Sequence, residues 1–266
     1  MTSGVRTVGS LRIRFEERGG DGPPLLLVNG LGAGLGRWGG FRDRLASRRR
    51  VITFDPPGVG GSPAPLRPLA MAELAATALG LLEALDAPEA DVLGYSFGGA
   101  VAQEMARLAP ARVRRLVLAA TTCGWGSPPG DPCAVTGATA RVMIDGRDTT
   151  WIGLWCQALA IGAWSSMPWL ATLPQPTLVL TGERDRVVPV AAARQLAHAI
   201  PRGRLEVVPG ADHWFLRRGD AGPAARPVEE FLARPSAFTA ADGTGGAGEA
   251  AAERAAQGGA GALACT

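Results

Sequence analysis

The sequence predicts an α/β domain in which helices cover both faces of a mostly parallel sheet. Short, fully apolar segments recur along the chain, for example at residues 25–28 and 51–54. Segments with helical spacing of apolar residues separate them. A strand that is apolar along its whole length is buried on both faces, which is typical of a parallel, doubly wound sheet. A chain of 266 residues is long enough for one such domain with an insertion.

The strands are expected where the sequence is apolar or alternates. At residues 12–17, Ile13 and Phe15 alternate with charged side chains, which indicates a half-buried strand. Further strands are expected at residues 24–29, 50–55, 91–95, 113–120, 176–182 and 204–208. Helices are expected where apolar residues recur every three to four positions, around residues 38–45, 74–85, 101–108, 191–200 and 224–232.

The alternation of strands and helices stops between residues 121 and 175. This segment is rich in Gly, Pro and Trp and has no strand pattern, so we predict a short helical cap inserted over one end of the sheet. The core then comprises residues 1–120 and 176–235. Residues 236–266 are dominated by Ala and Gly and contain too little apolar surface to offset their ordering entropy, so a disordered tail is predicted.

The composition excludes several classes of protein. The chain has 27 basic residues, all of them arginine, 24 acidic residues, four cysteines and two histidines. A histidine-rich metal protein, a lysine Schiff-base enzyme and a disulfide scaffold are therefore excluded, and we expect neither metal nor cofactor. The cysteines lack CxxC spacing and are interpreted as reduced thiols, with a bridge between Cys123 and Cys133 left open.

The charge pattern indicates neither a nucleic-acid partner nor a membrane span. The net charge is +3, and the densest basic run, residues 48–50, precedes an apolar strand and is interpreted as a solvated helix end. No apolar run approaches the roughly 20 residues that a membrane span needs. Because the first residues contain no apolar leader segment, a cytoplasmic location is expected.

Ser96 is the candidate nucleophile. It lies in the pattern G-x-S-x-G at residues 94–98, between a predicted strand and a predicted helix, which is the context of a nucleophile elbow. Such a turn strains the backbone at the serine, and glycines are needed at 94 and 98 to avoid collision with the neighbouring strand or helix. The following helix presents free N–H groups that favour developing negative charge.

A serine hydroxyl needs a base, and the chain offers two histidines. His198 lies inside a predicted helix and is interpreted as a surface or half-buried residue. His213 lies in the loop after the strand at 204–208, where a base at the sheet edge belongs. His213 is therefore the predicted base.

The order Ser…Asp…His requires an acid between Ser96 and His213. Asp185 follows the strand at 176–182 and is the predicted partner that accepts the imidazole N–H. Glu183 and Asp212 are rival carboxylates, although Asp212 adjoins the histidine and is poorly placed to face its ring. Asp55 follows another strand before a Pro-Pro-Gly turn and is interpreted as structural.

An oxyanion hole needs two N–H donors. One is predicted from Phe97, which follows the nucleophile. The other is expected in the loop after the strand at 24–29, and by position we choose Leu31.

Together these motifs resemble the α/β-hydrolase family over residues 10–234. More narrowly, the chain resembles the intracellular, medium-chain-length polyhydroxyalkanoate depolymerases in the segments 28–33, 54–62, 116–121 and 164–180. Asn29-Gly30 agrees with that group, whereas many other α/β-hydrolases have His-Gly there. Two features depart from it: Phe97 replaces a tryptophan, and segment 121–175 is shorter than the family's cap.

Tryptophans gather in the predicted cap, which contains five of the seven: Trp125, Trp151, Trp155, Trp164 and Trp169. They would form either an apolar lid or docking patch, or ordinary packing between the cap and the sheet. The predicted substrate-binding residues are Asn29, Trp125, Trp155, Trp164 and Trp214.

The resemblance and the predicted triad imply a serine ester hydrolase. The preferred substrate is an aliphatic 3-hydroxyacid polyester or its oligomers, which implies a storage-granule surface as a partner. The alternatives are a small-molecule esterase or lactonase, a cofactor-free perhydrolase of the haloperoxidase type, and a non-catalytic binding protein with the hydrolase fold.

Overall fold

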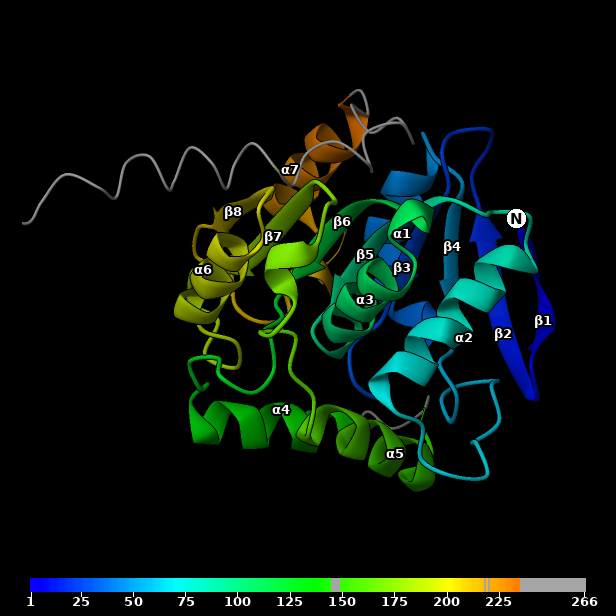
Figure 1. Cartoon of the computed structure of the whole chain (residues 1–266), viewed down its shortest axis with the longest axis horizontal. Coiled ribbons are helices and arrows are strands. Elements are labelled where there is room, and N and C mark those ends of the chain that lie inside the picture. Colours follow the sequence, from blue (N-terminus) through cyan, green and yellow to red (C-terminus); the bar gives the residue numbers. More distant parts are fainter. Residues whose placement is uncertain (145–148, 218, 220, 235–266) are drawn as a thin grey trace, which may run out of the picture. The chain divides into compact units, whose positions relative to one another are not determined.

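The computed structural model describes residues 1–144, 149–217, 219 and 221–234. The predicted tail, residues 236–266, lies outside these ranges. Within them, eight strands form one sheet in the order β1-β2-β4-β3-β5-β6-β7-β8 (Figure 1). β1 pairs antiparallel with β2 and β2 with β4, whereas all neighbours from β4 to β8 are parallel. The predicted fold class is confirmed.

The strands lie close to their predicted positions. They are β1 (Thr2–Val8), β2 (Leu11–Arg18), β3 (Leu25–Val28), β4 (Val51–Phe54), β5 (Ala90–Tyr95), β6 (Val113–Ala119), β7 (Thr177–Gly182) and β8 (Gly203–Val208). Every residue of β3, β4, β5 and β7 is buried, as their apolar character predicts. Strand β1 was not predicted from the sequence, because this edge strand is mostly exposed and its apolar residues do not alternate with polar ones.

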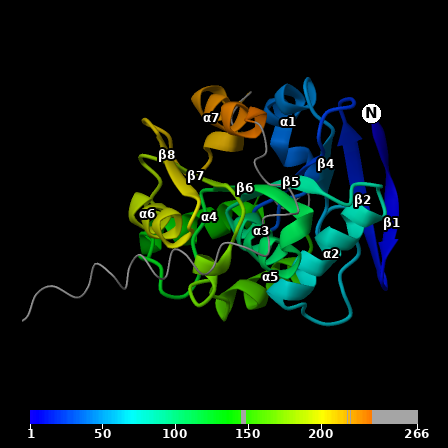
Figure 2. The ribbon, with the colours of Figure 1, turned by 45° about the horizontal axis from the view of Figure 1, so that its top comes forward.

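Helices pack on both faces of the sheet, as Figure 2 shows. One face is covered by α2 (Met71–Glu83), α3 (Phe97–Leu108) and α6 (Val190–Ala199), which pack with residues such as Leu26 and Val28. The other face is covered by α1 (Gly39–Ala46), preceded by the short helix η1 (Leu35–Trp38), and by α7 (Gly222–Ala233), which pack with Leu25 and Leu27. Successive residues of β3 thus pack into the hydrophobic cores on opposite faces of the sheet.

The connection between β6 and β7 carries two helices, α4 (Pro132–Ile144) and α5 (Trp151–Gly162), and the short helix η3 (Leu170–Thr172). In Figure 1, α4 and α5 lie in a row beyond one end of the sheet. Cys123, Cys133 and Cys156 are free thiols, so the bridge left open between Cys123 and Cys133 is absent. Among the described residues, no helix is both long and apolar enough to cross a membrane.

A charged cluster ties the amino-terminal edge of the sheet to α7. Asp91 in β5 is fully buried, and its carboxylate accepts hydrogen bonds from Arg49 at 2.6 Å and Arg115 at 3.4 Å. The same two guanidinium groups donate to the carbonyl oxygens of Leu232 and Arg234 at the end of α7. The buried carboxylate therefore holds two cations that in turn satisfy the carbonyls of a helix terminus.

Replacing Asp91 should destabilise the fold strongly. We expect Asp91→Ala to lower the free energy of unfolding by about 3–5 kcal/mol, because Arg49 and Arg115 would stay buried without their counter-charge. The measurement is urea denaturation followed by circular dichroism. Glu230→Ala, which breaks the exposed pair with Arg226, should change stability by less than about 0.5 kcal/mol. Equal losses in the two variants would contradict this account.

Candidate active site

Ser96 sits on a strained turn between β5 and α3. Its backbone angles are φ 53° and ψ −120°, a conformation that L-residues rarely adopt, and it costs about 1–3 kcal/mol. The turn is fixed on both sides, because Ser96 N donates to Ala119 O and Gly99 N donates to Ser96 O, each at 2.8 Å. The strain anticipated for this turn is present.

The glycines at 94 and 98 permit this turn. A Cβ atom on Gly94 would collide with the backbone of α3, and one on Gly98 would collide with the carbonyl oxygen of Val28 in β3. Strand and helix therefore approach more closely than any side chain allows, and Ser96 is presented at the carboxyl edge of the sheet.

His213 and Asp185 come together at the same edge. Asp185 follows β7, His213 follows β8, and His213 Nδ1 lies 2.8 Å from Asp185 Oδ2. The other oxygen, Oδ1, accepts from the N–H groups of Val187 and Val188 at 2.9 and 2.8 Å. Both side chains are buried. An aspartate that accepts three hydrogen bonds holds the imidazole in one orientation and leaves Nε2 as the ring nitrogen that can take a proton.

The rival groups lie elsewhere. The carboxylate of Glu183 accepts from Gly210 N at 2.7 Å, and that of Asp212 accepts from Trp214 N at 3.0 Å. His198 is exposed on α6. The geometry therefore pairs His213 with Asp185 rather than with either rival carboxylate.

The loop after β3 lies beside this turn, because β3 and β5 are neighbouring parallel strands. Leu31 and Phe97 both line the pocket that contains Ser96. Among the described residues, neither Leu31 N–H nor Phe97 N–H donates a hydrogen bond. Both donors are thus available to a ligand in the pocket.

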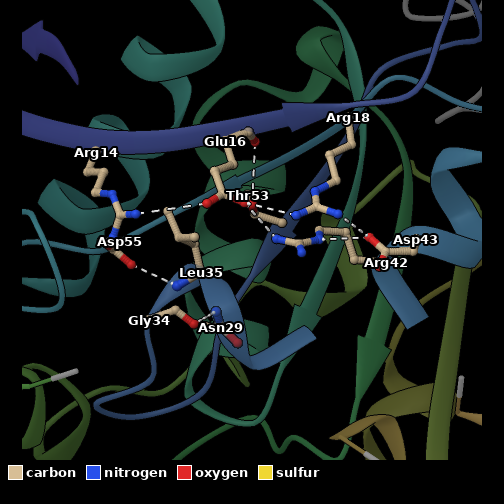
Figure 3. Close-up of polar contacts among 10 residues, drawn as sticks. All are labelled: Arg14, Glu16, Arg18, Asn29, Gly34, Leu35, Arg42, Asp43, Thr53 and Asp55. Carbon is tan, nitrogen blue, oxygen red and sulfur yellow. Dashed lines mark hydrogen bonds and ion pairs between the residues drawn. The ribbon is translucent and has the colours of Figure 1, made fainter. Parts of the chain in front are cut away.

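Asp55 and Asn29 each hold this loop through a hydrogen bond to its backbone, as Figure 3 shows. Asp55 Oδ1 accepts from Leu35 N at 2.7 Å, and Asn29 Nδ2 donates to Gly34 O at 2.8 Å. Asp55 Oδ2 accepts from Gly61 N at 2.8 Å, which ties the loop to the turn after β4. The structural interpretation of Asp55 therefore agrees with its contacts.

The pocket over Ser96 has a volume of about 230 Å³ and a largely apolar wall. The residues that line it include Ser96, His213, Leu31 and Phe97. Apolar residues complete it from the core and from α4 and α5: Ala100, Ala120, Val135, Ala138, Val142, Ile161, Val187 and Val188. A largely apolar pocket next to a nucleophile fits an aliphatic chain.

Four of the five predicted substrate-binding residues do not line this pocket. Asn29 is buried and bonded to the loop backbone, and Trp164 is buried with Nε1 donating to Glu104 at 2.9 Å. Trp125 and Trp155 are 71% and 64% exposed. Trp214 does line the pocket, where the guanidinium groups of Arg141 and Arg217 lie over its ring.

Sequence reasoning missed two residues that hold the site together. Tyr95 Oη donates to the carbonyl oxygen of His213 at 2.6 Å, and Gln157 Oε1 on α5 accepts from Gly32 N at 2.8 Å. Tyr95 has an available signal, since it adjoins the nucleophile and is the one aromatic residue of its strand. Gln157 has none, because its partner is 125 positions away. No cluster of metal-binding side chains occurs in the part of the chain that is described.

The comparisons with known proteins agree with this fold. The family described as "alpha/beta hydrolase fold" matches residues 23–143 and 144–217. The chain therefore belongs to the α/β-hydrolase family. A hydrolase from Pseudomonas aeruginosa PA01 has a solved structure that matches with a TM-score of 0.75 and 26% identity, covering 87% of this chain and 98% of that one.

Two relatives are, by name, a depolymerase and a methyl ester esterase. The chain is 32% identical over 243 residues to the poly(3-hydroxyalkanoate) depolymerase of Ectopseudomonas oleovorans, and the match covers 79% of this chain and 84% of the relative. It is 32% identical over 259 residues to the pimeloyl-[acyl-carrier protein] methyl ester esterase of Methylococcus capsulatus, covering 82% and 98%. The resemblance to polyhydroxyalkanoate depolymerases is confirmed.

The buried phenol of Tyr95 gives a direct test of the site's geometry. Burial raises the pKa of Tyr95 above its ordinary range, so the phenol stays a hydrogen-bond donor at all physiological pH values. Because the chain contains a single tyrosine, its ultraviolet titration reports this residue alone. We expect no tyrosinate absorbance near pH 10 in the folded protein and a transition there in guanidinium chloride. A folded-state transition near pH 10 would contradict the burial.

Proposed function

We propose that this member of the α/β-hydrolase family is a serine carboxylic-ester hydrolase whose substrate is an aliphatic 3-hydroxyacid polyester or its oligomers. One observation carries the proposal: Ser96 on its strained turn lines the same apolar pocket as His213, and the ring of His213 contacts Asp185 through Nδ1. A nucleophile, a base and an orienting acid on the loops of three parallel strands are the parts that acyl transfer through serine requires.

The first half of the proposed reaction forms an acyl-enzyme. Ser96 Oγ attacks the ester carbonyl carbon while its proton passes to His213 Nε2, and Asp185 stabilises the imidazolium. The N–H groups of Leu31 and Phe97 donate to the oxyanion of the tetrahedral intermediate. The intermediate collapses when the proton on Nε2 passes to the departing alkoxide, which leaves as an alcohol.

The second half releases the acid. His213 Nε2 takes a proton from a water molecule, and the hydroxide attacks the acyl carbon in the same oxyanion hole. When this second intermediate collapses, the proton on Nε2 returns to Ser96 Oγ and the carboxylic acid departs. No group outside the protein and water is needed for this sequence.

The connection between β6 and β7 supports an apolar substrate surface, and we propose residues 121–175 as the cap. Its outer side carries large exposed apolar side chains, including Trp125, Trp151, Ile152, Trp155 and Leu159. Residues 149–175 contain no charged side chain. Such a surface fits a water-insoluble polyester at the surface of a storage granule better than it fits a charged partner.

A soluble, small ester is the second candidate substrate. The limited pocket volume of about 230 Å³ and the similarity to a methyl ester esterase favour it. The chemistry at Ser96 is the same in both cases, so the two candidates differ in whether the exposed tryptophans contribute to turnover.

The proposed triad can be tested with a serine-directed probe and with variants of the two histidines. We expect a fluorophosphonate to label the wild-type protein and not to label the Ser96→Ala variant. His213→Ala should lower kcat on a p-nitrophenyl ester by about 10⁴- to 10⁶-fold, because serine loses its base. His198→Ala changes an exposed side chain and should leave kcat unchanged. Labelling that survives Ser96→Ala would refute the proposed nucleophile.

The polymer substrate is tested by removing two exposed tryptophans. Trp151 and Trp155 lie one helical turn apart and are 73% and 64% exposed, so the double replacement by serine should fold normally. We expect clearing of a poly(3-hydroxyoctanoate) emulsion to slow at least about ten-fold. Each indole that becomes buried against the polymer contributes more than about 1 kcal/mol to adsorption. Turnover of a soluble p-nitrophenyl ester should stay unchanged.

The matched control for this experiment is Val5→Ser, which removes an exposed apolar side chain from β1, the edge strand of the sheet that pairs with β2. It should leave both rates unchanged. If the wild-type protein hydrolyses the soluble ester and does not clear the emulsion, the small-ester candidate replaces the polymer.

A further inference from the structure

One buried hydrogen bond links the connection to the loop that carries Leu31. Gln157 on α5 is 1% exposed, and its Oε1 accepts from Gly32 N at 2.8 Å. Gly32 follows Leu31 directly, so a side chain from the connection holds the peptide group next to the proposed oxyanion donor.

The turn at residues 30–33 decides where Leu31 N–H points. Ala33 N donates to Gly30 O at 3.2 Å, which closes the turn, and Gly32 has a φ of +61°. In a trans peptide the C=O of one residue and the N–H of the next point in opposite directions. Since the Gly30 carbonyl points into the turn, Leu31 N–H points out of it. The hydrogen bond to Gln157 then fixes the following peptide group and with it the rotation of Leu31.

The other side-chain anchors of this loop come from the core and act further along it. Asn29 binds Gly34 O and Asp55 binds Leu35 N. Among the hydrogen bonds of the described residues, Gln157 supplies the side-chain anchor at the tip of the turn. The position of Leu31 N–H therefore depends on α5 as well as on the sheet.

The environment of Gln157 argues against a role in stability alone. Its Nε2 is buried and has no hydrogen-bond partner among the described residues. A buried donor without a partner costs about 1–3 kcal/mol, whereas an apolar side chain of the same shape avoids that cost. The carboxamide thus offers one useful atom, Oε1, and that atom is bonded to Gly32 N.

We propose that Gln157 is a positioning residue that holds Leu31 N–H toward the oxyanion. The geometry of the oxyanion hole then depends on the position of α5 against the loop after β3. This inference rests on the proposed function, since it assumes that Leu31 N–H stabilises the tetrahedral intermediate. The same helix exposes Trp151 and Trp155, so the surface proposed to dock on polymer and the anchor of the oxyanion loop belong to one element.

The decisive variant is Gln157→Met, which keeps the length of the side chain and removes the acceptor. We expect kcat on a p-nitrophenyl ester to fall about ten-fold, less than the 10²–10³-fold that loss of an oxyanion donor costs. KM should change less than about two-fold, because the oxyanion exists only in the transition state and the tetrahedral intermediates. Inhibition by an alkyl trifluoromethyl ketone, which forms a tetrahedral adduct with serine, should weaken by the same factor as kcat/KM.

Two further variants separate positioning from folding. Gln157→Glu keeps an acceptor oxygen and replaces the unpartnered amide nitrogen with a second oxygen. A buried carboxyl group without a cationic partner stays neutral, so this variant should retain more of the wild-type kcat than Gln157→Met. Gln175→Met removes another buried carboxamide, which donates to Ala106 O and Pro110 O away from the pocket, and it should leave kcat and ketone inhibition unchanged. Should Gln157→Met fail to fold, Gln157→Leu, which also lacks the acceptor, takes its place, and a folded Gln157→Leu with wild-type kcat and ketone affinity overturns the proposal.

The outcomes distinguish the inference from the function on which it rests. If the wild type is labelled at Ser96 and turns over, and folded Gln157→Met keeps wild-type kcat and ketone affinity, the positioning role is overturned and the proposed function stands. If the wild type shows neither labelling nor turnover, the proposed function fails and the inference fails with it.

Discussion

The close approach of β3, β5 and α3 is the constraint on which the site depends. Where Gly94 and Gly98 lie, backbone meets backbone with no room for a Cβ atom, and this contact holds Ser96 at φ 53°. The strain, about 1–3 kcal/mol, persists because the fully buried strands around it cannot shift without opening both cores. The position of Ser96 in the pocket therefore depends on the packing of both cores and not on the turn alone.

Parallel pairing brings the remaining candidate groups to the same edge, and a small number of polar contacts fix them there. Asp185 holds the ring of His213, Tyr95 holds the backbone of His213, and Asp55 holds the loop that carries Leu31. Each contact joins segments of the chain that belong to different strands or to the loops after them. Because these partners are buried, water competes little for the hydrogen bonds, and the loops are preorganised before a substrate enters.

The connection between β6 and β7 shows two different surfaces on α5. Gln157 faces the core side and binds Gly32 N, whereas Trp151 and Trp155 are exposed. A helix with no charged residue is ordinarily buried on all sides. These two surfaces correspond to the two functions proposed for α5, which the experiments on tryptophan and glutamine address separately.

The amino-acid sequence predicted the parallel sheet, the strained turn at Ser96 and the preference for His213 over His198, because apolar runs, glycine spacing and a helical or loop position are local properties. It did not reveal β1, whose exposed residues lack a pattern, or the placement of Asn29, Trp125, Trp155 and Trp164 outside the pocket. Asp185 was preferred to its rival carboxylates from the sequence, but its contact with His213 appears only in the folded chain, as do the contacts of Gln157 with Gly32 and of Tyr95 with His213. These contacts link residues 28 to 125 positions apart, and such pairings depend on how the strands order themselves in the sheet, which no local pattern encodes.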